Sequence, residues 1–195
     1  GMGAYAPVRH IPQATVDAAI EKILVPAAKG MSAKGIPFKG ILYAGIIATD
    51  EGPKTIEFNA RFGDPETQVV LNRLESDLAE VITSVLEGKE PELKWKQEGI
   101  DLGVVVAAKG YPEAYEKEIP LDLTASESVE IFFAGVTERN QQLVSNGGRI
   151  YLAAAAGETI EAAQSLIYDW LNQNDKQQLI YRKDIGDKAK QKNCK

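Results

Sequence analysis

Apolar and polar residues alternate along residues 54–60, and this pattern predicts a β-strand because successive side chains of a strand point to opposite faces. One face of the strand would carry Ile56, Phe58 and Ala60, and the other Glu57, Asn59 and Arg61. A carboxylate, an amide oxygen and a guanidinium would therefore stand in a row on one surface.

The residues after this strand predict a helix over 66–87, in which apolar residues recur at helical spacing and Gly88 ends the helix. Asp64 followed by Pro65 is typical of a helix N-cap with proline at the first helical position. Because a helix N-terminus is partly positive and has free backbone N–H groups, this arrangement would place an anion-binding end beside the polar strand face.

Upstream, the pattern predicts a helix that is capped by Thr15 and is kinked or restarted at Pro26. Residues 38–49 are apolar with little alternation, as in a strand that is covered on both faces. Asp50–Pro53 has the composition of a turn. The two strands should therefore pair as a β-hairpin.

A polar stretch over residues 88–97, which contains Pro91, indicates a boundary between two units. Beyond it, strand patterns cover 102–108, 129–133, 141–144 and 149–155, and a helix pattern covers 158–172. We therefore expect the α+β class, with one domain over residues 1–91 and a small α+β domain over residues 92–195.

The composition is that of a soluble globular protein, with 44% hydrophobic and 26% charged residues. The formal net charge of −6 argues against broad nucleic-acid binding, although the tail over 183–195 is locally rich in lysine. No apolar run approaches the ~18 residues of a membrane span, and no signal peptide is visible. The single cysteine, Cys194, cannot form an internal disulfide, which fits a cytoplasmic location.

The row formed by Glu57, Asn59 and Arg61 has the chemistry of a metal–phosphate site. Mg²⁺ prefers oxygen ligands, and an arginine can hold a phosphoryl group on which negative charge develops. Spacing alone nevertheless favours an ordinary solvent-exposed strand face. The only histidine, His10, lacks the partners of a metal cluster or a catalytic triad, and we expect it to be a loop or surface residue.

Four segments resemble the phosphoribosylamine–glycine ligase family, whose members are ATP-grasp enzymes of purine synthesis. The stretch Ile56–Gln68, with the run Phe-Gly-Asp-Pro-Glu, resembles the family signature. The likeness also includes Gly1–Pro7, Gly40–Gly45 and Tyr181–Gly186, in the family's order. The resemblance implies that residues 1–91 are the C-terminal part of an ATP-grasp domain and that residues 92–195 are the family's C-terminal domain.

The resemblance also implies an activity and a set of site residues. Family members join glycine to 5-phosphoribosylamine and cleave ATP to ADP and phosphate, through an acyl phosphate. Glu57 and Asn59 match the Mg²⁺ (or Mn²⁺) ligands that bridge the ATP phosphates, and Arg61 matches the residue that steadies the phosphoryl group. Gly1, Met2 and Gly3 match the loop that approaches phosphoribosylamine. Asp64 would orient the amine substrate, cap the helix, or do both.

Some departures and alternatives remain. Other ATP-grasp enzymes carry a further carboxylate about a dozen residues before the matching glutamate, but residues 43–45 contain no acid, so the metal would have more water ligands. Arg182 and Asp184 match the family's C-terminal motif, and an ion pair that anchors the tail explains them equally well.

The family's adenine-binding residues and phosphate lid lie upstream of the matched segments, so we expect this chain to need the N-terminal half of the ligase and to be inactive alone. Two other functions stay open. One is a different ATP-grasp ligase, such as a biotin-carboxylase-like enzyme. The other is a non-catalytic binding or assembly module.

Overall fold

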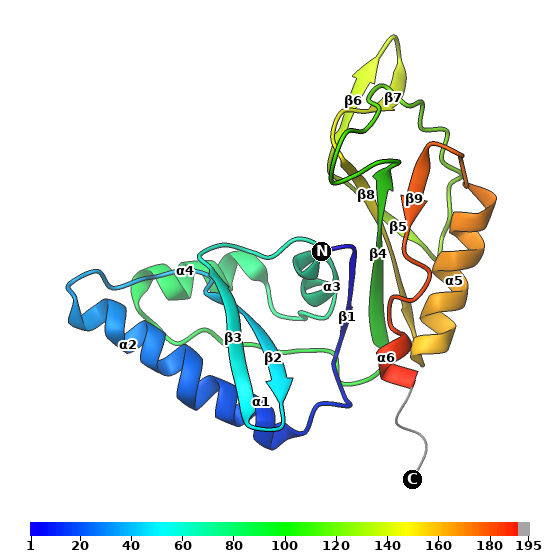
Figure 1. The fold of residues 1–195 in the computed structure, drawn as a ribbon. Helices are drawn as coiled ribbons and strands as arrows, with labels where there is room; N and C mark the ends of the chain where they lie inside the picture. Colours follow the sequence, from blue (N-terminus) through cyan, green and yellow to red (C-terminus); the bar gives the residue numbers. More distant parts are fainter. Residues whose placement is uncertain (191–195) are drawn as a thin grey trace. The chain divides into compact units, whose positions relative to one another are not determined.

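The computed structural model describes residues 1–190, which form two compact units, each built from segments that are separate in sequence (Figure 1). The hairpin unit consists of Val8–Gly63 and Leu74–Trp95, and the sheet unit consists of Gly1–Pro7, Asp64–Arg73 and the chain from Lys96 onward. These units follow spatial contacts and interleave along the chain, so the domain boundary near residue 91 stays a prediction. Cys194 lies outside the described residues.

The hairpin unit begins with a helical stretch made of α1 (Gln13–Ala19), the π-helical segment η1 (Ile20–Leu24) and α2 (Val25–Ala33). The expected interruption at Pro26 is confirmed: proline has no N–H to donate to the preceding turn, and the widened turn lies directly before it. The expected cap at Thr15 is wrong, because the helix already begins at Gln13, after Pro12.

The strands β2 (Tyr43–Thr49) and β3 (Gly52–Asn59) pair in antiparallel fashion, which confirms the predicted hairpin. The expectation that residues 38–49 form a strand covered on both faces is wrong on two counts. The strand begins only at Tyr43, and its second half is exposed. Ile47 and Ile56 keep 51% and 69% of their surface accessible, so apolar composition here does not mean burial within this unit.

The helix expected over residues 66–87 is two helices, α3 (Glu66–Leu71) in the sheet unit and α4 (Leu78–Glu87) in the hairpin unit. Asp77 is the reason that α4 starts anew, since its Oδ1 accepts hydrogen bonds from the backbone N–H groups of Ala79 (2.7 Å) and Glu80 (3.1 Å). Gly88 ends α4 in the left-handed conformation, at φ 76°, as predicted.

The sheet unit is an antiparallel sheet with the strand order β1-β4-β8-β5 (Figure 1). The strand β9 also pairs with β4, at residues 106–108, beyond the residues that pair with β1. Its strands are β1 (Gly3–Ala6), β4 (Ile100–Ala108), β5 (Glu130–Phe133), β8 (Arg149–Gly157) and β9 (Leu179–Tyr181). The strands β6 (Val136–Arg139) and β7 (Gln142–Ser145) form a separate ribbon. The helices α5 (Ile160–Gln173) and α6 (Asp187–Lys190) follow β8 and β9.

The main hydrophobic core lies between this sheet and α5, which packs along β4 and β8. Alternate residues of β4 face the core (Leu102, Val104 and Val106), and Val105 faces a smaller cluster on the opposite side. Val69 of α3 is almost fully buried, and Gly103 leaves space for it, because a Cβ there would come within 2.8 Å of Val69 Cγ2. The expected α+β class is confirmed.

A buried ion pair fastens the end of α3 to the start of β4. Arg73 Nη1 lies 2.8 Å from Asp101 Oδ2, and the two side chains are only 6% and 5% exposed. The guanidinium also donates to the backbone oxygens of Lys96 (2.6 Å), Glu98 (2.9 Å) and Gly99 (3.2 Å). Because its buried charge is both paired and hydrogen-bonded, Arg73 holds the segment 96–101 close to the end of α3.

Replacing Arg73 with methionine should lower the free energy of unfolding by about 3–5 kcal/mol, because Asp101 would remain buried without its counter-charge. The double variant Arg73→Met/Asp101→Leu should recover much of this loss. Urea denaturation measures both. Arg139→Met is the matched control, since its side chain is 64% exposed and lies 3.9 Å from Glu118. An equal cost for Arg73→Met and Arg139→Met would contradict the prediction.

Candidate functional site

Glu57 and Asn59 share one face of β3, as the alternation predicts. Asn59 Nδ2 donates a hydrogen bond of 3.0 Å to Glu57 Oε1, and both side chains are accessible to solvent. With the amide nitrogen turned to the carboxylate, Asn59 Oδ1 and Glu57 Oε2 are the oxygens left to contact a cation. The two residues thus provide a small cluster of hard oxygen donors, which suits Mg²⁺ or Mn²⁺.

The partner strand leaves room for the Glu57 side chain because a glycine lies directly across from it. Gly45 pairs with Glu57 in the hairpin register, and a Cβ at Gly45 would come within 3.1 Å of Glu57 Cγ. The register shifts between Gly45 and Ile46, and such a bulge changes the direction of neighbouring side chains. The local backbone is therefore shaped around the carboxylate.

Arg61 lies beyond the end of β3, in a bend, so strand alternation does not fix its direction. Its Nη1 donates a hydrogen bond of 2.7 Å to the backbone oxygen of Phe62. Its expected role at the phosphoryl group stays a prediction.

Asp64 does not cap a helix, and this expectation is wrong. The N-cap of α3 is Pro65, with no side-chain cap. Instead, Asp64 Oδ2 accepts a hydrogen bond of 2.9 Å from Arg149 Nη2, and the Asp64 backbone oxygen accepts one of 3.0 Å from Arg149 Nη1. The same Nη1 lies 3.2 Å from the backbone oxygen of Gly1. Arg149 was not among the predicted site residues, because its partner Asp64 lies 85 residues away in the sequence.

Gly1 and Gly3 are required by packing, whatever they bind. A Cβ at Gly3, in β1, would lie 2.7 Å from the Gly103 backbone oxygen and 2.8 Å from the Ile185 side chain. A Cβ at Gly1 would lie 2.7 Å from Pro65 Cδ. Between them, the Met2 backbone oxygen accepts a hydrogen bond of 3.0 Å from Val105 N. This segment is therefore held closely against the sheet.

The structure presents the predicted site residues in two groups. Glu57, Asn59 and Arg61 belong to the hairpin unit, whereas residues 1–3 and Asp64 belong to the sheet unit. Within the described part of the chain, no group of three or more His, Cys, Asp or Glu residues could hold a metal ion. A metal at Glu57 and Asn59 would therefore take further ligands from water and phosphate.

The C-terminal motif Tyr181–Gly186 is fastened to α5. Arg182 and Asp184 form an exposed ion pair, with Nε and Oδ1 2.8 Å apart, and the hydrogen bond from Arg182 holds the pKa of Asp184 below its usual value. Tyr168 of α5 donates to the Arg182 backbone oxygen (2.9 Å) and accepts from Ile185 N (3.2 Å). Partial burial raises the pKa of Tyr168 to about 12. The hydrogen bonds of Tyr168 thus hold this motif against α5, whereas the Arg182–Asp184 pair links residues only two apart, and the role of this pair stays a prediction.

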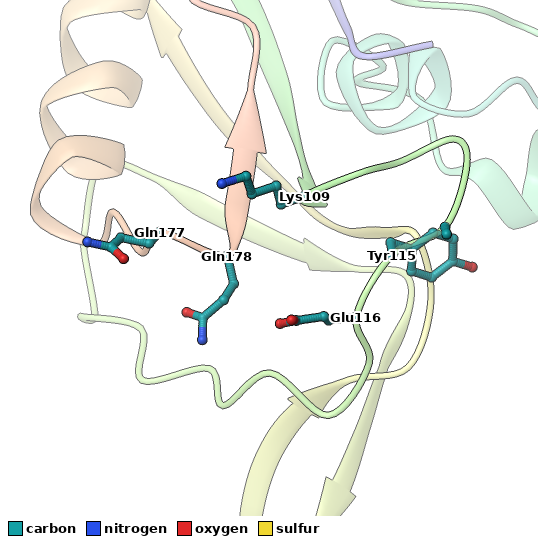
Figure 2. A pocket seen from close by; sticks show the side chains of 6 residues that line it. Lys109, Tyr115, Glu116, Gln177 and Gln178 are labelled. Carbon is teal, nitrogen blue, oxygen red and sulfur yellow. The ribbon is translucent and has the colours of Figure 1, made fainter.

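A pocket of about 510 Å³ lies elsewhere in the sheet unit (Figure 2). Its lining residues are Lys109, Ala114, Tyr115, Glu116, Gln177 and Gln178. It contains none of the predicted site residues. None of the helices in the described part of the chain has the length and apolar character needed to cross a membrane.

Solved structures with low sequence identity share this fold. The biotin carboxylase of Campylobacter jejuni superposes with a TM-score of 0.62 at 15% identity, covering 93% of this chain and 39% of that one. The family model of the phosphoribosylglycinamide synthetase ATP-grasp (A) domain matches residues 1–67. Residues 1–67 are therefore part of an ATP-grasp domain, as expected.

A second family model, the phosphoribosylglycinamide synthetase C domain, matches residues 101–188. The chain is 49% identical to the phosphoribosylamine–glycine ligase of Streptococcus pneumoniae and 53% identical to that of Listeria monocytogenes, over 97% of its own length. The crystal structure of this ligase from Thermotoga maritima has a TM-score of 0.83 at 35% identity, covering 95% of this chain and 46% of that one. The chain belongs to the phosphoribosylglycinamide synthetase family.

The chain spans about half the length of these relatives, 46% for both the Streptococcus pneumoniae and the Listeria monocytogenes protein. It corresponds to their C-terminal half.

Tyr168, which anchors the C-terminal motif, should lose its hydroxyl proton only at a pH well above that of an ordinary tyrosine. Because the folded pKa of Tyr168 is raised above the ordinary value of 10, its contribution to stability is present below pH 10 and is lost as the pH rises towards 12. Tyr168→Phe should cost about 1 kcal/mol at pH 9, where it removes hydrogen bonds, and this gap should narrow at pH 11. Urea denaturation at the two pH values measures the gap, and a constant gap would argue against the shifted pKa.

Proposed function

We propose that this chain is the C-terminal half of a phosphoribosylamine–glycine ligase, which joins glycine to 5-phosphoribosylamine and cleaves ATP to ADP and phosphate. The observation that carries this proposal is the Glu57–Asn59 pair, whose oxygens share one face of a strand within a segment that matches the family's ATP-grasp domain. Membership in a family of purine-synthesis enzymes also supports the cytoplasm as the location.

The reaction needs charge neutralisation and alignment more than a protein nucleophile. The glycine carboxylate attacks the γ-phosphate of ATP, which forms an acyl phosphate and releases ADP. The amine of phosphoribosylamine then attacks the acyl carbon, the C–O bond to phosphate breaks, and the amine loses a proton. In both steps negative charge develops on neighbouring oxygens of the phosphoryl group and the acyl phosphate, so cationic groups must stabilise this charge.

Glu57 and Asn59 would hold a divalent metal, Mg²⁺ or Mn²⁺, because Glu57 Oε2 and Asn59 Oδ1 are the oxygens that their mutual hydrogen bond does not use. A bound metal supplies charge neutralisation for the ATP phosphates. The 3.0 Å hydrogen bond from Asn59 to Glu57 orients both donors in advance. Arg61 would steady the phosphoryl group and the acyl phosphate, since a guanidinium matches phosphate geometry.

Asp64 and the segment formed by Gly1, Met2 and Gly3 would bind phosphoribosylamine. The Asp64 carboxylate can accept hydrogen bonds from an amine, and its side chain is 45% exposed. The backbone of residues 1–3 is held by its contacts to β4 and to Pro65, so any ligand beside it would meet a fixed surface.

The remaining half of the ligase is the expected partner of the hairpin unit. Ile47, Ile56 and Phe58 have 51%, 69% and 46% of their surface exposed, and Ala19 is the one buried apolar residue of this unit among those described. A unit with so little core is incomplete by itself. An N-terminal half of the length seen in the relatives would cover these side chains and supply the adenine site.

The isolated chain should form no glycinamide ribonucleotide from glycine, phosphoribosylamine and Mg-ATP. A chimera that joins the unmatched N-terminal part of the Streptococcus pneumoniae relative to this chain should form it. Product formation by both proteins at the same rate would refute the need for the N-terminal half. Product from neither, with both proteins folded, would instead favour a non-catalytic module, and phosphate release with a different acid and amine would favour another ATP-grasp ligase.

In that chimera, Glu57→Gln and Asn59→Ala should each weaken Mg-ATP binding on the order of 10- to 100-fold, because each removes a metal oxygen donor or its charge. Isothermal titration calorimetry with Mg-ATP measures the loss. Glu51→Gln is the matched control: it is the same substitution in the same hairpin, at a side chain that is 81% exposed and pairs with Lys54. Equal affinities for Glu57→Gln and Glu51→Gln would refute the assigned metal ligands.

A further inference from the structure

Arg149 joins the two segments of the sheet unit to which the family resemblance assigns substrate binding. Its guanidinium contacts three oxygens: the Gly1 backbone oxygen, the Asp64 backbone oxygen and Asp64 Oδ2, at 3.2, 3.0 and 2.9 Å. We propose that Arg149 is a positioning residue for the amine substrate, which sets the direction of the Asp64 carboxylate and holds the backbone of residues 1–3 beside it. This proposal rests on the proposed ligase function.

The backbone around Arg149 is fixed on both sides. Its own carbonyl oxygen accepts a hydrogen bond of 3.0 Å from Gly135 N, and the carbonyl oxygen of Gly148 accepts one of 2.8 Å from Ala108 N. A Cβ at Gly148 would lie 2.3 Å from the Tyr111 ring, so only glycine fits before the arginine. The side chain therefore projects from a rigid point at the start of β8.

A β-bulge determines where this side chain points. In the pairing of β4 with β8, Val106 lies opposite Tyr151, but Ala107 lies opposite Arg149, so one residue of β8 is extra. A bulge of this kind bends the strand and redirects a side chain, and bulges are frequent next to active sites. Without the shift, alternation along β8 would set Arg149 in a different direction.

The arginine uses one oxygen of the Asp64 carboxylate and leaves the other available. Among the described residues, Asp64 Oδ1 receives a contact of 3.4 Å from Gln68 Nε2, which is long for a hydrogen bond. Since Arg149 holds Oδ2 and the backbone oxygen of the same residue, Oδ1 keeps one direction in which to accept a substrate N–H. A lysine has a single compact ammonium and cannot hold two groups in this planar geometry.

Steady-state kinetics of the chimera, with Arg149→Lys and Arg149→Ala, tests the proposal. Both variants should raise the KM for phosphoribosylamine on the order of 10- to 100-fold, because a small misplacement of an orienting group has effects of this size. The KM for ATP should stay near that of the unsubstituted chimera. Arg139→Ala, at an exposed arginine of the same unit, is the matched control and should change neither constant.

Three results would overturn the positioning role. The first is an unchanged KM for phosphoribosylamine in Arg149→Ala. The second is a parallel rise of both KM values with a lowered melting temperature, which a purely structural role would produce. The third is an equal rate of hydrogen exchange, in the isolated chain, for the amides of Gly3–Ala6 and Glu66–Leu71 with and without Arg149→Lys. We expect these amides to exchange faster in Arg149→Lys, because the arginine anchors both segments.

The exchange measurement separates this proposal from the proposed function. A chimera that forms no product refutes the ligase assignment, and the exchange rates then still decide whether Arg149 anchors the two segments. A chimera that forms product, with equal KM values in all the Arg149 variants, supports the ligase and refutes the positioning role.

Discussion

The buried ion pair of Arg73 and Asp101 is the interaction on which the arrangement of the sheet unit depends. Desolvating two charges is costly, and it is offset here by a 2.8 Å contact and by three backbone oxygens around the same guanidinium. All of these acceptors lie just before β4 or at its start. The pair thereby fixes the end of α3 to the central strand, which is buried along its whole length.

A second arginine fixes the other end of the same segment. The stretch Asp64–Arg73 starts at the carboxylate held by Arg149 and ends at the guanidinium held by Asp101. The two ion pairs differ in exposure: the Arg73–Asp101 side chains are 6% and 5% exposed, whereas those of Arg149 and Asp64 are 25% and 45% exposed. The buried Arg73–Asp101 pair holds the fold and has no atom accessible to a ligand. The partly exposed Arg149–Asp64 pair keeps a carboxylate oxygen that a substrate can reach. The burial of each pair therefore matches its proposed role.

Local patterns in the sequence predicted what is determined locally. The hairpin, the strands β4, β5, β7 and β8, the helix α5 and the glycine end of α4 follow from periodicity and turn residues, and the shared face of Glu57 and Asn59 follows from alternation. The short strands β1, β6 and β9 were not predicted. The break between α3 and α4 escaped prediction because apolar spacing continues through it. In the sequence, the break is marked by Asp77 as a possible N-cap, and an aspartate inside a helical pattern is a weak signal.

The arginines that fix the segment Asp64–Arg73 could not be found in this way. Arg149 and Asp64 are 85 residues apart, and Arg73 and Asp101 are 28 residues apart, so no motif contains both partners. The pairing depends on a bulge in β8 and on tertiary packing against β4, which single-sequence patterns do not encode. The same limit explains the wrong cap at Asp64: a local reading assigned its carboxylate to the neighbouring helix, but a distant guanidinium competes for the same oxygens. At Asp64, the long-range pairing with Arg149 thus overrides the local preference of an aspartate for a helix N-cap.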